Sequence, residues 1–600
     1  MNPTQPGTFD LEDTLPRVPL PTLEDTCARF LTWCAPLLTP DQLATTSTAV
    51  TAFLNGEGPT LHAALAAYDA TPGVHSWLDR FWPSRYLGRR DRIALNANFL
   101  FLFAESPQSQ TERAAHLIAS AVDYKRRLDE ETIPPLLRRG QPLAMDQNKY
   151  LFATTRIPGA HQDTVRAPYS DAHPGPATAR HILVFHRRHL HRLDVLDATG
   201  RPYSADDLDA ALQRIVKDTT HTAPDDTAAG HLTTKARAAW AATRDTLRAH
   251  DPANAATLED IETALFAVCL EDLTPADDLE ACDRLLHGDS GNRWFDKAVS
   301  LIVFADGTAG INVEHCGLDG TTILSFVDDI LTTPTDHPTA GTPATRPLTF
   351  VLDDALRADI ADAARSFADY AADTATTTVS FPDFGVDRAK QLKISPDAFV
   401  QMAYQLAHRR AKGLTGATYE SIATRHFRAG RTEAMRVVTP ETITFVDALT
   451  STDATDATDK DKTAALRAAA DAHVQRAKDC QAGDAPEQHL WELQLIASRQ
   501  PELGVTGPIA LFDSPGWTVS RDDYLSTSSA PSANIRYFGF GMTSTKCIGV
   551  AYVLLPDRFN LYLSTPRPVA DAMHTFAAEL RTAVTELQDL LAAEGGVAHR

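Results

Sequence analysis

The stretch from Phe304 to Asp329 reads FADGTAGINVEHCGLDGTTILSFVDD, and it contains the pattern that decides the fold of this chain. Apolar residues stand at alternate positions before and within it, including Val303, Ile311 and Val313, which predicts a buried strand. Two glycines then favour a turn. The sequence therefore predicts a strand that runs into a turn, and His315 lies at the junction.

His315 has the surroundings of a candidate base. A strand-to-turn junction is a common place for a catalytic side chain, and imidazole can take up a proton near neutral pH. Asp319 follows four residues on, where it could order the ring or only brace the turn, and both readings stay open. A lone histidine is more often structural. Cys316 is a conceivable nucleophile, but beside His315 on a strand it would point the opposite way, so we expect it to pack.

Composition bounds the class of protein. The chain has 600 residues, of which 43% are hydrophobic and 22% charged, which is typical of a globular protein with two or more domains. A net charge of -22 argues against nucleic-acid binding. Seven cysteines without CxxC spacing indicate neither disulfides nor a structural metal. His186, His189 and His191 lie in a predicted half-buried strand pair, and we expect no metal there.

Targeting signals and membrane spans are not evident. No apolar run approaches the ~20 residues that cross a bilayer. The N-terminus has neither a basic nor an apolar region of a secretory signal, and the C-terminus, EGGVAHR, is not of the SKL type. We therefore expect a cytoplasmic monomer without membrane association, and the bias toward Ala, Thr, Asp and Arg is typical of a bacterial protein.

Two biased tracts suggest the domain organisation. Residues 331–347, rich in Thr, Pro and Gly, are predicted to be an exposed linker, and residues 450–466 a solvated loop that runs into a helix. We predict a helical segment at 1–76 that packs on the C-terminal half, a first domain at 77–347 with His315, and a second domain at 348–600. Strands alternate with helices in both halves, which predicts an α/β fold.

Four motifs carry a resemblance to a known family. They are EHxxxDG around His315, KQLKISPDAFVQMA, TYES followed by GRTE, and LSTS followed by FG. In this order and spacing they resemble the carnitine/choline acyltransferase family, and the likeness extends to GQPLAMDQNKYLFATTRIPG and LLHGDSGNRWFDK. It implies two similar domains of the chloramphenicol-acetyltransferase type with a tunnel between them. It also implies direct acyl transfer from CoA to a small hydroxyl compound, as in carnitine O-acetyltransferases.

The resemblance assigns the chemistry of transfer. It implies His315 as general base, Asp319 as the acidic residue of the motif, and Ser528 as the hydrogen-bond donor to the oxyanion, with Ser526 beside it. The family commonly has glutamine after LSTS, where this chain has Ser529.

CoA binding needs cations for its phosphates. Lys390 matches a phosphate-contacting lysine of the family and Asp397 matches the aspartate of SPD, while Arg388 and Lys393 complete a basic run in an acidic chain. The second expected lysine falls on Val386. CoA or acyl-CoA is thus expected as a cosubstrate, with no permanently bound cofactor.

The acceptor residues depart from the carnitine-specific pattern. Tyr419 and Thr432 are present, but Gln488 stands where those enzymes have an arginine, and Ala434 replaces a threonine. Phe538 matches the ring that lies against a trimethylammonium group. The resemblance therefore implies a small, carnitine- or choline-like alcohol.

Two further residues complete the predicted site. Tyr86 matches an aromatic residue that faces the acceptor tunnel, and Arg536 stands where short-chain members have a bulky residue, which predicts a short acyl group. The alternative function is a condensation-type enzyme that uses carrier-bound acyl groups, since HxxxDG is shared with that class. Those enzymes have a second histidine, where this chain has Glu314. A binding module is disfavoured, because His315, Ser528 and Lys390 are all retained.

Overall fold

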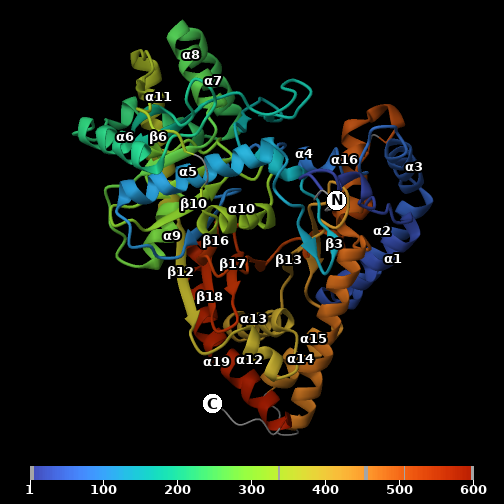
Figure 1. Cartoon of the computed structure of the whole chain (residues 1–600). Coiled ribbons are helices and arrows are strands. Elements are labelled where there is room, and N and C mark those ends of the chain that lie inside the picture. Colours follow the sequence, from blue (N-terminus) through green and yellow to red (C-terminus); the bar gives the residue numbers. More distant parts are fainter. Residues whose placement is uncertain (1–5, 336–337, 452–456, 506, 596–600) are drawn as a thin grey trace, which may run out of the picture. The chain divides into compact units, whose positions relative to one another are not determined.

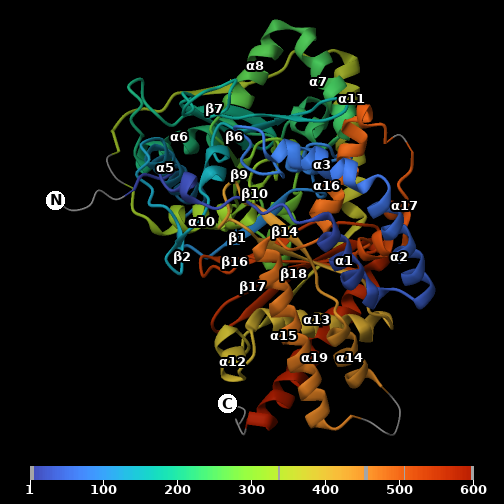
Figure 2. The same cartoon turned by 90° about the vertical axis from the view of Figure 1, so that its right-hand side faces the viewer.

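The structure, a computed structural model, describes residues 6–335, 338–451, 457–505 and 507–595. Within them the chain forms two compact units. Unit 1 comprises 1–15, 82–374 and 532–541, and unit 2 comprises 16–81, 375–531 and 542–600. Each unit contains one large mixed sheet with helices packed on it, which confirms the predicted α/β class (Figures 1 and 2).

Unit 1 is built on an eight-stranded sheet. Its order is β11 (Thr345–Leu348), β7 (His189–Asp194), β6 (His181–His186), β8 (Ala267–Leu270), β9 (Val299–Val303), β10 (Ala309–Val313), β1 (Phe99–Phe103) and β16 (Ile535–Phe540). The pairs β6–β8 and β8–β9 are parallel. The small hairpins β2 (Leu137–Arg138) with β3 (Gln141–Pro142) and β4 (Thr155–Ile157) with β5 (Thr164–Arg166) stand apart.

The strand predicted before His315 is in fact a hairpin. β9 and β10 are antiparallel, with Val303 opposite Ala309, and every residue of both strands is buried. The turn forms because Gly307 has a φ of 85° and the Asp306 carboxylate accepts a hydrogen bond from the Thr308 N–H at 3.0 Å. The alternation of apolar residues predicted one strand, because β9 and β10 follow each other closely and both are apolar and buried.

Helices cover the sheet of unit 1. They are α4 (Phe81–Tyr86), α5 (Gln110–Asp129), α6 (Ala205–Asp218), α7 (Arg237–His250), α8 (Pro252–Thr263), α9 (Asp278–Leu286), α10 (Gly320–Thr332) and α11 (Asp354–Ala372). Short 3-10 helices are η1 (Glu12–Thr14), η3 (Asp146–Tyr150), η4 (Asp225–Thr227), η5 (Ala229–Thr234) and η6 (Ser290–Asn292). α5 begins with a capping box of Ser109 and Glu112 and packs against α6 and α10.

Unit 2 contains a six-stranded sheet. Its order is β12 (Thr374–Phe381), β18 (Phe559–Pro566), β17 (Ile548–Leu554), β15 (Leu525–Ser529), β13 (Thr418–Ala423) and β14 (Thr432–Arg436). β15 is parallel to both β13 and β17. α13 (Pro396–Lys412) and α19 (Ala570–Gly595) pack together on this sheet, and buried rings such as Phe399, Phe559 and Phe576 fill the core (Figure 1).

The N-terminal helices belong to unit 2. α1 (Leu23–Cys34), α2 (Pro40–Asn55) and α3 (Gly58–Asp69) pack against α16 (Glu487–Arg499), α17 (Ala510–Asp513) and α18 (Pro515–Ser520). Thr26 Oγ1 lies 2.7 Å from His489 Nδ1 across this contact. The remaining elements are α12 (Val386–Gln391), α14 (Pro440–Thr450), α15 (Asp459–Ala482), η2 (Ala35–Leu37), η7 (Pro501–Leu503) and η8 (Arg567–Val569).

The two biased tracts are only partly loops. The predicted linker at 331–347 ends in β11, which pairs with β7, so its last residues belong to the sheet of unit 1. The tract at 450–466 enters α15 at Asp459, as predicted, while residues 336–337 and 452–456 lie outside the described residues. The histidine-rich segment forms the predicted strand pair as the antiparallel strands β6 and β7, but every residue of β6 is buried and only β7 is half-buried. His186 Nε2 lies 3.0 Å from Asp272 Oδ1.

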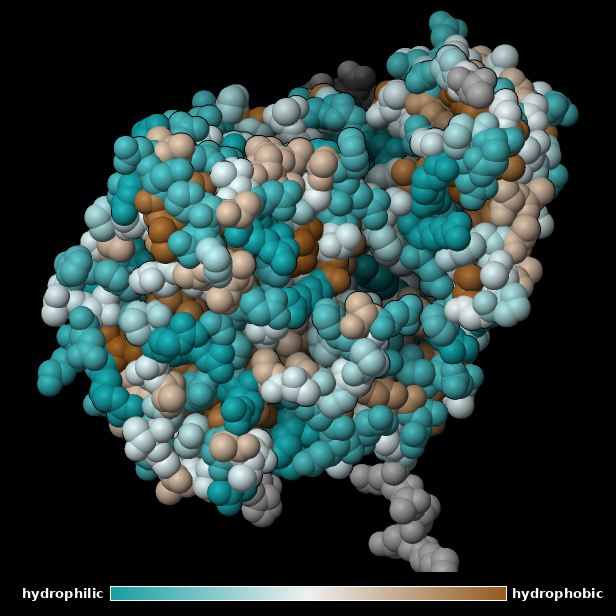
Figure 3. Space-filling model, turned by 90° about the horizontal axis from the view of Figure 1, so that it is seen from above, coloured by the Kyte–Doolittle hydropathy of each residue, from teal (hydrophilic) through white to brown (hydrophobic). Residues whose placement is uncertain are grey.

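The face of the molecule drawn in Figure 3 is mostly polar, with apolar residues scattered in small groups. Among the described residues, the exposed large hydrophobic side chains are Leu137, Val351 and Leu414, which lie far apart in sequence. No helix of the described ranges combines the length and apolar character that a bilayer crossing requires.

Candidate active site

His315 lies two residues after the end of β10, at the junction that the sequence predicted. The Glu314 N–H donates to Ala298 O at 3.1 Å, and α10 begins five residues after the histidine. The ring of Tyr86 stacks on the imidazole at a centroid distance of 4.5 Å, and Phe99 meets it edge-on at 5.5 Å. The imidazole is therefore held between two aromatic rings and keeps 23% of its surface exposed.

Asp319 lies where either of the two roles left open for it could be met. Its Oδ1 lies 3.6 Å from His315 Nδ1, so the carboxylate faces the ring. It is also the N-cap residue of α10, and its Oδ2 accepts a hydrogen bond from Gln147 Nε2 at 2.8 Å. The same carboxylate thus faces the imidazole at a distance longer than a hydrogen bond and is tied into the turn.

A buried ion-pair network lies behind this histidine, and sequence reasoning missed it. Arg156 donates to Glu314 Oε1 at 2.8 Å, to Asp163 Oδ2 at 2.6 Å and to Tyr86 O at 2.7 Å. Burial alone would lower the pKa of Arg156, but Glu314 and Asp163 raise it. Arg156 therefore holds Glu314, which precedes His315, and the backbone carbonyl of Tyr86, whose ring stacks on the imidazole. In the sequence, the sign of this network was a charged residue, Arg156, within the otherwise uncharged stretch TTRIPG.

Cys316 is not suited to be a nucleophile. Its side chain is buried, and burial together with the Glu314 carboxylate raises the pKa of its thiol well above the usual range. The thiolate is the reactive form of cysteine, so this residue stays unreactive at neutral pH. The packing role predicted for it agrees with this environment.

β16 brings Phe538 and Arg536 into unit 1. Phe538 pairs with Phe101 in the sheet, and its ring centroid lies 6.3 Å from that of Phe99. The Phe99 ring therefore lies between Phe538 and His315. Arg536 stands two residues before Phe538 on this strand, and its Nη1 lies 2.7 Å from Asp278 Oδ1 and 3.2 Å from Glu105 Oε1. It lines a cavity of about 340 Å³ together with Asp277, Asp306 and those two acids.

In unit 2, β15 and β13 present a polar face. Tyr419 of β13 stands opposite Ser526 of β15. Because side chains alternate along a strand, Ser526 and Ser528 point to one face, and Thr527 points to the other. There the buried Thr527 hydroxyl donates to Tyr419 O at 2.9 Å and accepts from Gln401 Nε2 at 2.9 Å. This bond fixes the register of the two strands that carry the predicted residues.

Gln488 and Thr432 are in direct contact. Gln488 is buried in the first turn of α16, and its Nε2 donates to Thr432 O at 2.8 Å. Its Oε1 has no hydrogen-bond partner among the described residues. Next to it, Glu487 accepts two bonds from Arg436, at 2.6 and 2.8 Å, and Asp523 contacts the same guanidinium at 2.5 Å. The buried guanidinium of Arg436 is thus already paired with the carboxylates of Glu487 and Asp523.

The basic residues predicted for CoA lie on α12 and just after it. Lys390 and Lys393 are exposed, and Lys393 has a φ of 55° at the end of the helix. Arg388 is half-buried, and its Nε donates a hydrogen bond to Gln588 Oε1 of α19 at 3.1 Å. Two exposed lysine side chains and one anchored guanidinium therefore form a cationic segment before α13.

Asp397 belongs to a buried cluster that the sequence did not reveal. Tyr552 donates to its Oδ1 at 2.7 Å, and nearby His473 Nε2 lies 2.8 Å from Glu420 Oε2. Burial and the Asp397 charge raise the pKa of Glu420 to about 7. The ligand atoms of Asp397, Glu420 and His473 lie within 4.8 Å of one another, a spacing that would suit a metal, but the direct histidine–carboxylate bond already pairs two of them.

A family model described as Choline/Carnitine o-acyltransferase matches residues 18–582. The chain belongs to this family. Membership confirms the resemblance seen in the sequence and identifies the chain as an acyltransferase, for which the family implies acyl-CoA and a small acceptor as substrates.

Two carnitine acyltransferases are similar to this chain over most of its length, and one solved structure is a distant neighbour. A mitochondrial carnitine O-palmitoyltransferase 2 of Bos taurus is 31% identical over 589 residues, covering 89% of this chain and 87% of its own length. A carnitine O-acetyltransferase of Homo sapiens is 30% identical and covers 97% and 94%. A trichothecene 15-O-acetyltransferase from Fusarium sporotrichioides is a solved structure with 10% identity, a TM-score of 0.40, and coverage of 83% and 93%.

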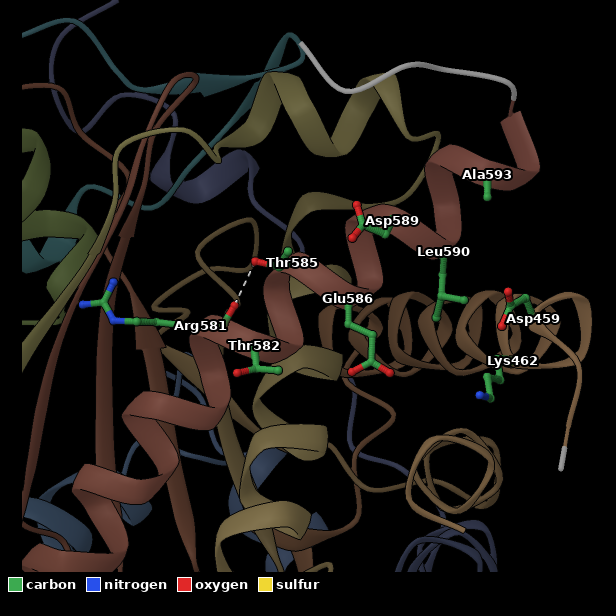
Figure 4. A pocket seen from close by; sticks show the side chains of 9 residues that line it. All are labelled: Asp459, Lys462, Arg581, Thr582, Thr585, Glu586, Asp589, Leu590 and Ala593. Atoms are coloured by element: carbon green, nitrogen blue, oxygen red, sulfur yellow. Dashed lines mark hydrogen bonds between the residues drawn. The ribbon is translucent and has the colours of Figure 1, made fainter. Parts of the chain in front are cut away.

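Not every hollow of this acyltransferase suits its substrates. A groove of about 790 Å³ in unit 2 lies between the start of α15 and α19 (Figure 4). Its lining carries three acids, Asp459, Glu586 and Asp589, against two bases, Lys462 and Arg581, and no histidine is among the described residues that line it. The net charge of this lining is negative and it offers no candidate base, so we do not assign it to the active site.

Proposed function

We propose that this protein transfers a short acyl group between CoA and the hydroxyl group of a small acceptor, with His315 as general base. The observation that carries the proposal is the setting of the imidazole, between the Tyr86 and Phe99 rings and with Nδ1 facing Asp319. Since Nδ1 faces the carboxylate, Nε2 is the nitrogen available for the acceptor proton.

The transfer would proceed in one ternary complex. Nε2 takes the hydroxyl proton while the oxygen attacks the thioester carbon, and Ser528 donates to the resulting oxyanion. When the carbon–sulfur bond breaks, His315 returns the proton to the thiolate of CoA. An acyl-enzyme is not needed, and the raised pKa of Cys316 argues against one.

CoA would bind through its phosphates and its pantetheine arm. We assign Lys390, Lys393 and Arg388 to the phosphates, since they form the cationic segment before α13. Asp397, at the start of α13, would lie near the pantetheine arm.

The acceptor would be an alcohol without a carboxylate, held by Tyr419, Thr432, Ser526 and Phe538. Gln488 carries no charge, and the guanidinium of Arg436 is occupied by Glu487 and Asp523. A cationic head group remains compatible with Phe538. The Arg536 guanidinium, tied to Asp278, supports a short acyl group, because a long chain would meet ion-paired side chains.

The alternative, condensation with carrier-bound acyl groups, is less well supported. The position of the second histidine is Glu314, which is fully buried and paired with Arg156. Isothermal titration with free CoA separates the two functions. We expect saturable binding of CoA and thiol release from acetyl-CoA in a screen of small hydroxyl acceptors, whereas absence of CoA binding would favour the carrier-dependent enzyme.

A further inference from the structure

The turn that joins His315 to α10 is enclosed by the 3-10 helix η3 (Asp146–Tyr150), which comes from a distant part of unit 1. Gly317 lies against the ring of Tyr150, and a Cβ at this position would fall 2.8 Å from the ring carbon Cδ1. Only a residue without a side chain fits there, so the turn and η3 form one closely packed assembly.

Gln147 of η3 makes three hydrogen bonds to this turn. Its Nε2 donates to Asp319 Oδ2 at 2.8 Å, while its Oε1 accepts from the Asp319 N–H at 2.8 Å and from Thr322 Oγ1 at 3.0 Å. The two bonds to Oε1 fix the orientation of the amide, because a backbone N–H can only donate. Nε2 is therefore committed to the carboxylate, and the side chain of Gln147 is buried.

This arrangement decides how Asp319 meets the histidine. With Oδ2 held by the amide, Oδ1 is the oxygen that lies 3.6 Å from His315 Nδ1. We propose that Gln147 is a positioning residue, which acts on the imidazole through Asp319 by holding the carboxylate in the orientation that keeps Nε2 available to the substrate. This inference rests on the proposed role of His315 as general base.

Asn148 offers a matched control in the same 3-10 helix. It is also buried, but it accepts from the Tyr124 hydroxyl at 2.9 Å and donates to Met145 O at 2.8 Å, and within the described part of the chain neither of these side-chain bonds reaches the turn. Asn148→Leu should therefore lower stability without acting on Asp319.

Gln147→Met and Gln147→Glu test the proposal in the full-length protein. Gln147→Met removes all three bonds and should lower kcat about ten-fold or more at every pH, with the KM for the acyl donor nearly unchanged. Gln147→Glu places two carboxyl groups at hydrogen-bond distance, where they hold one proton between them. A protonated Glu can still donate to Asp319, so this variant should approach wild-type kcat near pH 6 and lose it as the pH rises.

The kcat of Gln147→Glu should therefore fall as the pH rises. The wild-type kcat should rise over the same range, because a general base must be neutral to accept a proton. Gln147→Glu should thus show a bell-shaped kcat profile where the wild type only rises. A Gln147→Glu profile parallel to that of the wild type, or a Gln147→Met variant that loses stability like Asn148→Leu but keeps full kcat, would overturn the inference.

A second measurement does not depend on catalysis. The shared proton raises the folded-state pKa of the carboxyl pair, so the stability deficit of Gln147→Glu relative to wild type should widen as the pH rises from about 5 to about 8. If the wild type released no thiol from any donor, the proposed function would fail. A deficit independent of pH would instead show that the contact between Gln147 and Asp319 is wrong, whatever reaction the protein catalyses.

Discussion

The substitution Gln488→Arg should turn this protein toward carboxylated acceptors. Gln488 offers neutral groups, and its Nε2 is engaged with Thr432 O at 2.8 Å. The nearby Arg436 cannot help, because Glu487 accepts two of its bonds and Asp523 contacts the same guanidinium. An arginine at position 488 could keep the bond to the carbonyl and still present a second N–H to a carboxylate.

The expected gain follows from the strength of that bond. A charge-assisted hydrogen bond contributes about 1.5–3 kcal/mol, and about 1.4 kcal/mol corresponds to ten-fold in rate. The kcat/KM for carnitine should therefore rise about ten-fold or more. Without a carboxylated ligand the buried guanidinium is partly unpaired, so the variant should also be less stable than the wild type, and carnitine should restore part of that loss.

Thiol release from acetyl-CoA, with carnitine and choline as matched acceptors, measures the effect. Choline lacks the carboxylate, so its kcat/KM should stay constant or fall. Gln494→Arg adds the same charge to a half-buried position of α16 and should leave both acceptors unchanged. A wild type that already uses carnitine with a low KM, unaltered by Gln488→Arg, would refute the reasoning and assign the carboxylate to another group.

Three further outcomes test the proposed site. His315→Ala should abolish thiol release while titration with CoA still gives an affinity within a few-fold of wild type, and near-normal activity would remove the residue from the mechanism. Lys390→Ala should weaken CoA more than dephospho-CoA, since only CoA has the 3'-phosphate, and equal losses would place the lysine elsewhere on the cofactor. Acetyl-CoA should be turned over faster than palmitoyl-CoA because Arg536 occupies an acid-lined cavity, and the reverse order would contradict the short-chain assignment.

The strand-to-turn junction at His315 could be predicted because its signal is local. Alternating apolar residues, a histidine and two glycines stand within one short stretch, and the structure places a buried strand, His315 and a turn there. Asp319 followed from its spacing alone, since four residues bring it back to the ring in a turn of this kind.

The residues that sequence reasoning missed are joined only by the fold. Asp397, Glu420 and His473 come from α13, β13 and α15, and no spacing connects them. Arg156 and Glu314 likewise lie far apart in the chain, and an arginine in a strand pattern gives no indication of which carboxylate it will meet. Long-range pairing between polar residues depends on packing that periodicity does not report.

The position of β16 has a consequence for biosynthesis. β1 has the sequence FLFLF, with all five residues buried, and it lies between β10 and β16 in the finished sheet. Until residue 540 has left the ribosome, β1 is an apolar edge strand, which is a ready template for pairing with another chain. The first unit therefore cannot finish folding as it is synthesised. A nascent or truncated chain that ends before Ser532 should require a chaperone to stay monomeric.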